Sequence, residues 1–241
     1  MTKKGVIPKL FSKLTIILFR GYKNIGPQTL FLSLLSGILL SLAFPLFNLP
    51  LLAWVALVPL FIAVENKSSQ KAFFLGWLSG TVHFTILLHW LTVSMIQYGN
   101  LSTTTSFFLL LLVSLYLGLY IGIWGGALVF FRSHYSYESA IVAPLIWILL
   151  EFLRAHLFLG FPWGLLGYSQ YQNLSIIQIS DVTGVYGVSF LIILLNSAIY
   201  LIVKWARFHS NNFPYRYALV TVILFVTVIT YGTVKKMPSI V

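Results

Sequence analysis

Seven long apolar runs divide the chain, and short polar or basic segments connect them. The runs cover approximately residues 28–44, 48–64, 72–95, 103–131, 138–158, 182–204 and 216–232. About 20 apolar residues in a helix are enough to cross a hydrocarbon core roughly 30 Å thick. The pattern therefore predicts an all-α membrane protein in which residues 27–233 form a bundle of about seven transmembrane helices.

Residues 1–26 form a basic segment ahead of the first run. Its apolar stretch, residues 14–19, is too short for a signal peptide and has no small-residue cleavage site. Leu10, Leu14 and Ile17 fall on one helical face, and basic side chains surround them. This arrangement predicts an interfacial amphipathic helix on the inner leaflet.

The basic residues collect in alternate connections. Besides six in the N-terminal segment, the predicted inner side carries Lys67, Lys71, Arg132, Lys204, Arg207 and Arg216. Lysine and arginine are enriched in cytoplasmic loops, so the N-terminus is predicted to be cytoplasmic and the C-terminus to lie on the far side. Lys235 and Lys236, after the seventh run, are the discordant loop charges.

Composition agrees with the membrane assignment and excludes chemistry that depends on cysteine. The chain is 59% hydrophobic and 8% charged, with a net charge of +11 and a mean hydropathy of +0.94. Water-soluble domains carry about 25% charged residues. The positive charge favours anionic lipid head groups over nucleic acid as a partner. With no cysteine in the sequence, thiolate metal sites and cysteine nucleophiles are excluded, and we predict no metal and no cofactor.

Histidines and hydroxyls give no catalytic motif. His83 and His89 are six positions apart and lie on different helical faces, which argues against a two-histidine metal site. A hydrolytic triad of His89, Ser94 and Asp181 lacks any nucleophile-elbow motif. Two sets of small residues, Gly76 with Gly80 and the series Gly118, Gly122 and Gly126, have the spacing typical of close helix packing in membranes.

Residues 157–181 form a connection unlike the others, long and rich in aromatic residues. Pro162 ends or kinks any helix there, and Gly160, Gly164 and Gly167 loosen the backbone. Non-helical backbone at membrane depth must lie against protein or a wet cavity, so we predict a re-entrant loop. Its aromatic residues, placed at the outer interface, form either a rim that holds an acyl chain or an ordinary aromatic belt. These residues are Phe161, Trp163, Tyr168 and Tyr171.

Three charged residues border this loop. Glu151 and Arg154 are three positions apart on one helical face and can pair. Ionisable residues inside a membrane segment are candidates for function, and the alternative is an internal brace that fixes the helix of residues 138–158 against the loop. Asp181 is predicted to cap the N-terminus of the helix of residues 182–204.

Two stretches carry a resemblance to a known family. The sequences GFPWGLLGYSQ, residues 160–170, and DVTGVYGVSFL, residues 181–191, resemble the membrane domain of apolipoprotein N-acyltransferases. Weaker similarity is found in HWLTVSMIQYGN, residues 89–100, and in LLAWVALVPLF, residues 51–61. The similarity extends over about residues 28–232.

The resemblance implies a bacterial inner-membrane enzyme of lipoprotein biosynthesis. Such an enzyme moves an acyl chain from a phospholipid, chiefly phosphatidylethanolamine, to the amino group of the diacylglyceryl-cysteine that begins a lipoprotein. The family's chemistry belongs to a nitrilase-like domain outside the membrane, where a Glu, Lys and Cys triad forms a thioester. Pro162, Trp163, Tyr168 and Gln170 are implied as parts of a phospholipid platform, and Arg154 as an attractor of lipid phosphate.

One departure from the family limits this expectation. The sequence ends at Val241, it contains no cysteine, and residues 234–241 resemble the lead into the missing extracytoplasmic domain. We therefore expect the membrane half of such an enzyme, truncated, split between two genes or ended by a frameshift, and inactive alone. A separately encoded nitrilase-like domain is then an expected partner. The alternatives are a non-catalytic membrane anchor and a small-molecule transporter, although no internal repeat supports a transporter.

Overall fold

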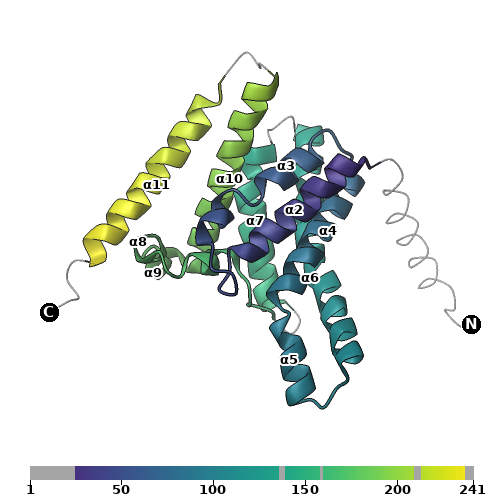
Figure 1. Ribbon diagram of the computed structural model, residues 1–241. Coiled ribbons are helices and arrows are strands. Elements are labelled where there is room, and N and C mark those ends of the chain that lie inside the picture. The colour runs from purple at the N-terminus through teal and green to yellow at the C-terminus, as the bar shows by residue number, and fades with distance from the viewer. Residues whose placement is uncertain (1–24, 136–138, 158–159, 209–212, 237–241) are drawn as a thin grey trace, which may run out of the picture.

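The computed structural model describes residues 25–135, 139–157, 160–208 and 213–236. Within these residues the chain forms helices joined by turns and contains no strand (Figure 1). The predicted all-α class is therefore confirmed for the described residues. The predicted interfacial helix of residues 1–26 lies almost entirely outside them.

The helices follow the apolar runs closely. Their order is α2 (Pro27–Leu42), η1 (Pro50–Trp54), α3 (Val58–Val64), α4 (Ser69–Leu87), α5 (Trp90–Gln97), α6 (Thr103–Tyr135), α7 (Ser139–His156), η2 (Leu166–Gln170), α8 (Leu174–Ile177), α9 (Ser180–Thr183), α10 (Val185–Phe208) and α11 (Tyr215–Lys236), where η denotes a 3-10 helix. In the described residues, α6, α10 and α11 are each long and apolar enough to cross a membrane. A fourth candidate is the pair α4 and α5.

Two of the expected spans are interrupted. The run at residues 48–64 is not one helix, because η1 ends at Trp54 and α3 begins at Val58. The run at residues 72–95 is bent by 51° between α4 and α5. The helix α2 has 16 residues and is about 24 Å long. Seven full crossings therefore stay a prediction, whereas three or four candidate spans are found.

A buried asparagine stabilises the break between η1 and α3. Asn196 of α10 donates from Nδ2 to the carbonyl oxygen of Ala53 at 2.9 Å, and its Oδ1 accepts from the Leu57 amide at 2.9 Å. Both are backbone groups that the break leaves without helical partners. In a membrane such groups need a partner within the protein, so Asn196 makes the interrupted segment tolerable.

Glycines allow α4 and α6 to pack closely. A Cβ added at Gly80 would lie 2.9 Å from the Cα of Gly118, and one added at Gly76 would overlap the carbonyl oxygen of Ile121. Only glycine allows the two backbones to approach this closely. The predicted packing role of these glycines is confirmed.

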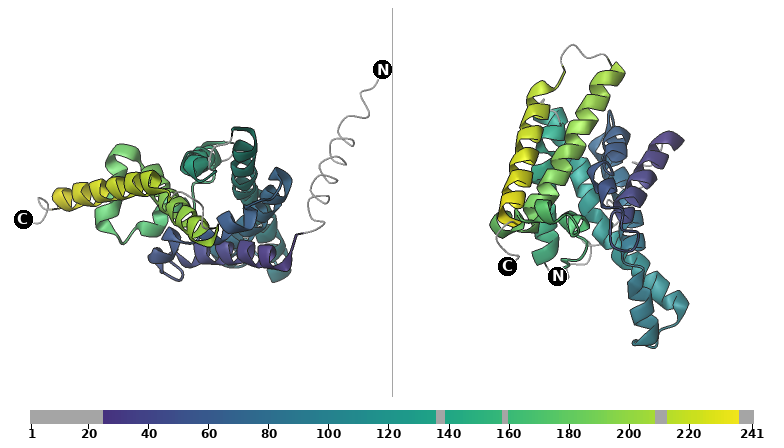
Figure 2. Two further views of the ribbon diagram at one scale, coloured as in Figure 1. Left: turned by 90° about the horizontal axis from the view of Figure 1, so that it is seen from above. Right: turned by 60° about the vertical axis from the view of Figure 1, so that its left-hand side comes forward.

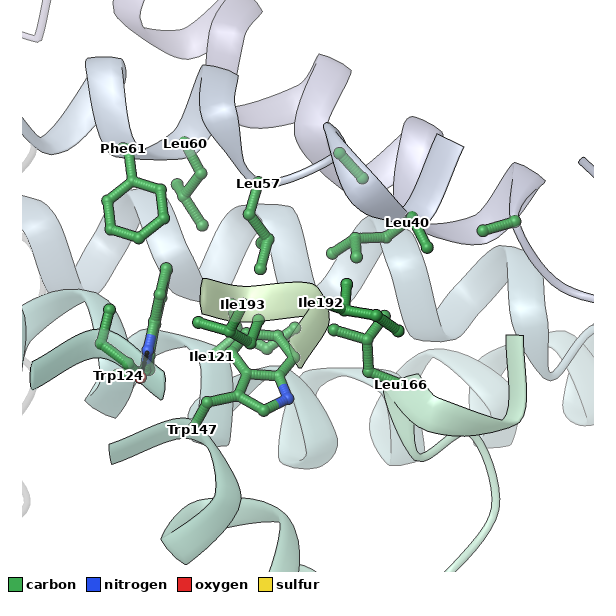
Figure 3. Close-up of a cluster of buried hydrophobic side chains, with 14 of the residues drawn as sticks. Leu40, Leu57, Leu60, Phe61, Ile121, Trp124, Trp147, Leu166, Ile192 and Ile193 are labelled. Atoms are coloured by element: carbon green, nitrogen blue, oxygen red, sulfur yellow. Dashed lines mark hydrogen bonds between the residues drawn. The ribbon is translucent and has the colours of Figure 1, made fainter. Parts of the chain in front are cut away.

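Aromatic side chains fill the centre of the bundle. Phe61 of α3 stacks on Tyr200 of α10 at 5.1 Å between ring centroids, and its other neighbour is Trp124 of α6 at 5.1 Å. Trp124 in turn meets Trp147 of α7 edge to face at 5.2 Å. Figure 3 shows the rings of Phe61, Trp124 and Trp147 among Leu57, Leu166 and other buried side chains. These ring contacts therefore join α3, α6, α7 and α10 in one core.

One end of the molecule carries both the aromatic connection and a projecting hairpin. The α8 and α9 helices lie at the level where α11 ends, and α5 with the start of α6 extends further in the same direction (Figures 1 and 2). At 33 residues, α6 is about 50 Å long, well beyond the roughly 30 Å of a hydrocarbon core. The α6 helix is therefore longer than a single crossing requires. Its first part and α5 form the projecting hairpin, which extends beyond the rest of the bundle (Figures 1 and 2).

Candidate functional site

The candidate site is the connection of residues 157–181, between α7 and α10. Gly160 and Gly164 both adopt positive φ, at 61° and 70°, a conformation that other residues rarely adopt. These two turns direct the chain back against the bundle, where η2 follows. The predicted irregular loop is present, and its depth in a membrane stays a prediction.

Arg154, near the end of α7, holds the first part of this loop. Its Nη1 donates to the carbonyl oxygen of Trp163 at 2.8 Å, and its Nη2 donates to that of Gly164 at 3.1 Å. The guanidinium also lies over the ring of Phe84, 5.1 Å from the centroid. The residue is 4% exposed. The buried guanidinium thus donates to two loop carbonyls. Such hydrogen bonds are strong because the donor is charged.

Glu151, one helical turn earlier, holds the second part of the loop. Its Oε1 accepts a hydrogen bond from the Leu166 amide at 2.7 Å. The next amide, that of Gly167, donates to the hydroxyl of Ser189 on α10 at 2.9 Å. Glu151 and Arg154 form no direct ion pair among the described residues, although their charges are close enough to interact electrostatically. Each contacts the loop instead, an arrangement that supports the brace.

The outer face of the loop is aromatic. Trp163, Tyr168 and Tyr171 are 54%, 47% and 44% exposed. The ring of Trp163 meets Phe161 at 5.1 Å and Trp90 of α5 at 5.8 Å, both edge to face. Pro162, next to Trp163, is also exposed. The contacts of Trp163 thus join the loop to the projecting hairpin. Together with the exposed rings of Tyr168 and Tyr171, these side chains are here called the aromatic rim.

An apolar cavity of about 440 Å³ opens beside this rim. It lies between α6, the end of α7 and the start of the loop, and Phe161 forms one of its walls. No sequence pattern predicts this cavity, because the α6 residues that line it are ordinary apolar positions of a long helix. The lining residues are Val113, Tyr116, Leu117, Arg154, Leu157, Gly160 and Phe161.

Gln170, which the family resemblance implied as part of a phospholipid platform, is buried beneath the aromatic side chains of the loop. It is 1% exposed, and its Oε1 accepts from Trp54 Nε1 at 3.1 Å. Its Nε2 donates to the carbonyl oxygen of Pro50 at 2.9 Å and to Ser169 Oγ at 3.0 Å. Gln170 therefore links η2 to η1 and supports the rim from inside.

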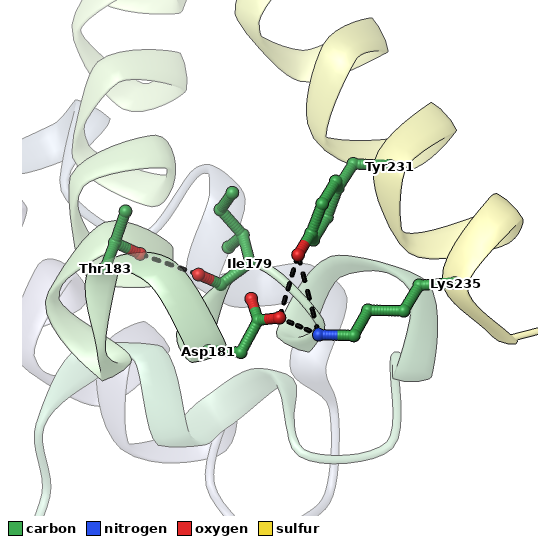
Figure 4. A network of polar contacts seen from close by, with 5 residues as sticks. All are labelled: Ile179, Asp181, Thr183, Tyr231 and Lys235. Carbon is green, nitrogen blue, oxygen red and sulfur yellow. Dashed lines mark hydrogen bonds and ion pairs between the residues drawn. The ribbon is translucent and has the colours of Figure 1, made fainter.

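Asp181 binds the last helix and does not cap the helix that follows it. The α9 helix has Ile179 as its N-cap residue, with no side-chain capping bond, and α10 begins only at Val185. Tyr231 of α11 donates to Asp181 Oδ2 at 2.8 Å, and Lys235 forms an ion pair with the same oxygen (Figure 4). The predicted capping role is wrong, because a distant helix supplies the partners.

His83 and His89 belong to no metal site in the described residues. No group of three or more His, Cys, Asp or Glu side chains with the geometry to hold a metal occurs in the described part of the chain. His83 is buried between Phe44 and Phe84, with Nδ1 3.1 Å from Ser41 Oγ. His89 contacts the carbonyl oxygen of Ile86 at 3.2 Å. Both histidines have local packing partners.

Comparison with known proteins assigns the family. The sequence profile of the apolipoprotein N-acyltransferase N-terminal domain matches residues 36–198, a range that contains the loop, Glu151 and Arg154. The chain belongs to the apolipoprotein N-acyltransferase family. With its candidate spans, it is a multi-pass membrane protein of this family.

Several curated apolipoprotein N-acyltransferases are similar to the chain. That of Geobacter metallireducens is 38% identical over 203 residues, which are 83% of this chain and 39% of the relative. Those of Pasteurella multocida and Haemophilus influenzae are 31% and 32% identical, over 71% and 76% of this chain and 32% and 34% of theirs. The chain thus spans about a third to two fifths of the length of these relatives.

Removal of the Arg154 charge should release the loop. The chain has no cysteine, so Ser169→Cys places a single thiol at a fully buried position of η2. In that background, Arg154→Met leaves the Trp163 and Gly164 carbonyls unpaired, and we expect maleimide labelling of the thiol to become about tenfold faster. This acceleration corresponds to an opening easier by about 1.4 kcal/mol. Lys71→Met, which removes a cation from α4, is the control and should leave the labelling rate unchanged. Equal labelling rates in Arg154→Met and Lys71→Met would contradict the view that Arg154 fixes the loop.

Proposed function

We propose that this chain is the lipid-binding membrane part of an enzyme that transfers an acyl chain from phosphatidylethanolamine to the N-terminal diacylglyceryl-cysteine of bacterial lipoproteins. Family membership supports the reaction, and the observation that carries the role of this chain is the apolar cavity beside an exposed aromatic rim. The rim and the cavity together are here called the lipid platform. It consists of Phe161, Pro162, Trp163, Tyr168 and the α6 residues Val113, Tyr116 and Leu117.

The chemistry of the platform suits an acyl chain. Its walls are apolar, so a hydrocarbon chain gains by leaving contact with water, and aromatic rings at its edge are at home at a membrane interface. Arg154 borders the cavity, but its guanidinium is bound to the Trp163 and Gly164 carbonyls. We therefore assign Arg154 to fixing the platform and not to direct contact with the lipid phosphate.

We further propose that the platform faces the outer leaflet of the inner membrane. The α3–α4 connection and the C-terminal ends of α6 and α10 lie at the end of the bundle opposite the aromatic loop (Figure 1). These segments contain Lys67, Arg132 and Lys204, respectively. Under the positive-inside rule that end is cytoplasmic. The N-terminus is then cytoplasmic, and α11 ends at Lys236 on the periplasmic side.

The covalent step is assigned to a nitrilase-like domain with a Glu, Lys and Cys triad, acting on the periplasmic side together with this chain. The 241 residues contain no cysteine, so they cannot supply the thiolate on which a thioester forms. The proposed division is a basic segment at 1–26, a membrane domain at 27–233 and a lead into the catalytic domain at 234–241. Phospholipid and lipoprotein are the proposed substrates of the assembly.

The chain alone should transfer no acyl group. Reconstituted in liposomes with phosphatidylethanolamine and a diacylated lipopeptide, it is expected to yield no triacylated product by mass spectrometry. The full-length Geobacter metallireducens relative, treated in the same way, is the positive control. Triacylated product from the 241-residue chain would overturn the assignment of the chemistry to another domain.

Lipid binding should depend on Trp163. In liposomes that contain photoactivatable phosphatidylethanolamine, we expect Trp163→Ala to reduce crosslinking at residues 157–171 severalfold, because the rim loses its largest apolar surface. Trp205→Ala is the matched control, since Trp205 is also partly exposed but lies near the opposite end of α10. If the two variants crosslink equally to the unmodified chain, the lipid platform is wrong.

A further inference from the structure

Two lysines at the end of α11 are the basic residues that the predicted topology leaves unexplained. In the periplasmic orientation proposed above, on which this inference rests, Lys235 and Lys236 follow the last span on the outer side. The positive-inside rule disfavours lysines at such a position, and a membrane potential that is negative inside draws cations toward the cytoplasm. The surroundings of Lys235 show how the fold accommodates this charge.

Lys235 is paired with an acidic residue of the aromatic connection. Its Nζ forms an ion pair with Oδ2 of Asp181, in α9, and the same oxygen accepts a hydrogen bond from the Tyr231 hydroxyl at 2.8 Å (Figure 4). Lys235 Nζ also lies 3.5 Å from the Tyr231 oxygen and 5.6 Å from the centre of its ring. Because Tyr231 lies about one helical turn before Lys235, both side chains reach Asp181 from the same face of α11.

The backbone of α11 comes close to the aromatic connection at the same level. A Cβ added to Gly232 would overlap the carbonyl oxygen of Ser175, in α8, so only glycine permits this approach. Earlier in α11, by contrast, apolar side chains such as those of Leu219, Val222 and Val226 are more than half exposed. The end of α11 is thus held against α8 and α9, whereas much of the helix before it faces away from the protein.

Asp181 is the acidic residue placed to offset the charge of Lys235. The other acidic residues in the described part of the chain are Glu65, at the C-terminal end of α3, and Glu151, which is buried and bound to the Leu166 amide. Carboxylates have little influence on topology through net charge alone, so an effect of Asp181 requires direct contact. The side chains of Lys235 and Asp181 are 43% and 37% exposed, which leaves their pair partly shielded from water and salt.

We propose that Asp181 is a topology-determining residue, which pairs with Lys235 and thereby holds the C-terminal end of α11 on the periplasmic side, next to the loop that carries the lipid platform. Pairing cancels the charge on which the membrane potential acts. It also opposes the return of Lys235 toward the cytoplasm, because Asp181 would then be left without its partner.

Thiol accessibility tests this role, because the chain contains no cysteine. Val234→Cys places one thiol beside Lys235, at a position that is 65% exposed. A membrane-impermeant maleimide is added to cells whose outer membrane alone is permeabilised, and labelling is compared with total labelling in detergent. We expect most thiols of the Val234→Cys chain to be labelled from outside, and we expect Asp181→Asn to reduce that fraction severalfold.

Two further variants separate the loss of charge pairing from misfolding. Lys235→Gln, added to Asp181→Asn, removes the unpaired cation and should restore labelling from outside. Glu65→Gln changes the net charge by the same amount as Asp181→Asn, but at the opposite end of the bundle, and should have no effect. Unchanged labelling in Asp181→Asn, or an equal loss with and without Lys235→Gln, would overturn the role of Asp181. If the Val234→Cys chain itself is labelled only in detergent, the proposed orientation is wrong as well.

Discussion

The hydrogen bonds from the charged face of α7 to the backbone of the 157–181 loop are the interaction on which the rest of the structure depends. Arg154 binds two loop carbonyls and Glu151 binds one loop amide, so non-helical backbone is satisfied inside an apolar bundle. In a membrane only the protein can supply these partners. A buried arginine and a buried glutamate separated by one turn thus each bind a different part of the loop backbone. The exposed rim of Trp163 and Tyr168 keeps its position because its backbone is held from beneath.

The same constraint explains the other irregular segment. The break between η1 and α3 is satisfied by Asn196, and Gln170 connects η1 to the loop through Trp54 and Pro50. Two interrupted segments, far apart in sequence, therefore support one another at the end of the bundle that carries the aromatic rim. The tightly packed α4 and α6 helices and the aromatic core supply a rigid base on which this end is built. For the proposed lipid platform such a base is an advantage, since a preorganised protein surface loses less conformational entropy when a ligand binds.

Much of this arrangement was predictable from the sequence, because apolar runs, glycine spacing and loop composition are local signals. The helices lie close to the predicted runs, the glycines of α4 and α6 pack as their spacing indicates, and the irregular loop lies where Pro162 and its glycines place it. The failures concern contacts between distant segments. Asp181 finds its partners on α11, and Gln170 is turned inward by Trp54, pairings that no local pattern encodes. The run at residues 48–64 was expected as one helix because hydropathy does not register the break that Asn196 stabilises.

The central claim is that Glu151 holds the loop backbone through the amide of Leu166. Amide hydrogen exchange of Leu166, followed residue by residue in the unmodified chain in a lipid environment, tests it most directly. The account predicts strong protection, comparable to that of amides inside α10, although Leu166 begins a short 3-10 helix and its amide has no helical partner. Exchange as rapid as that of an unstructured peptide would contradict it, because the amide would then be open to water and the carboxylate would not be bound to it.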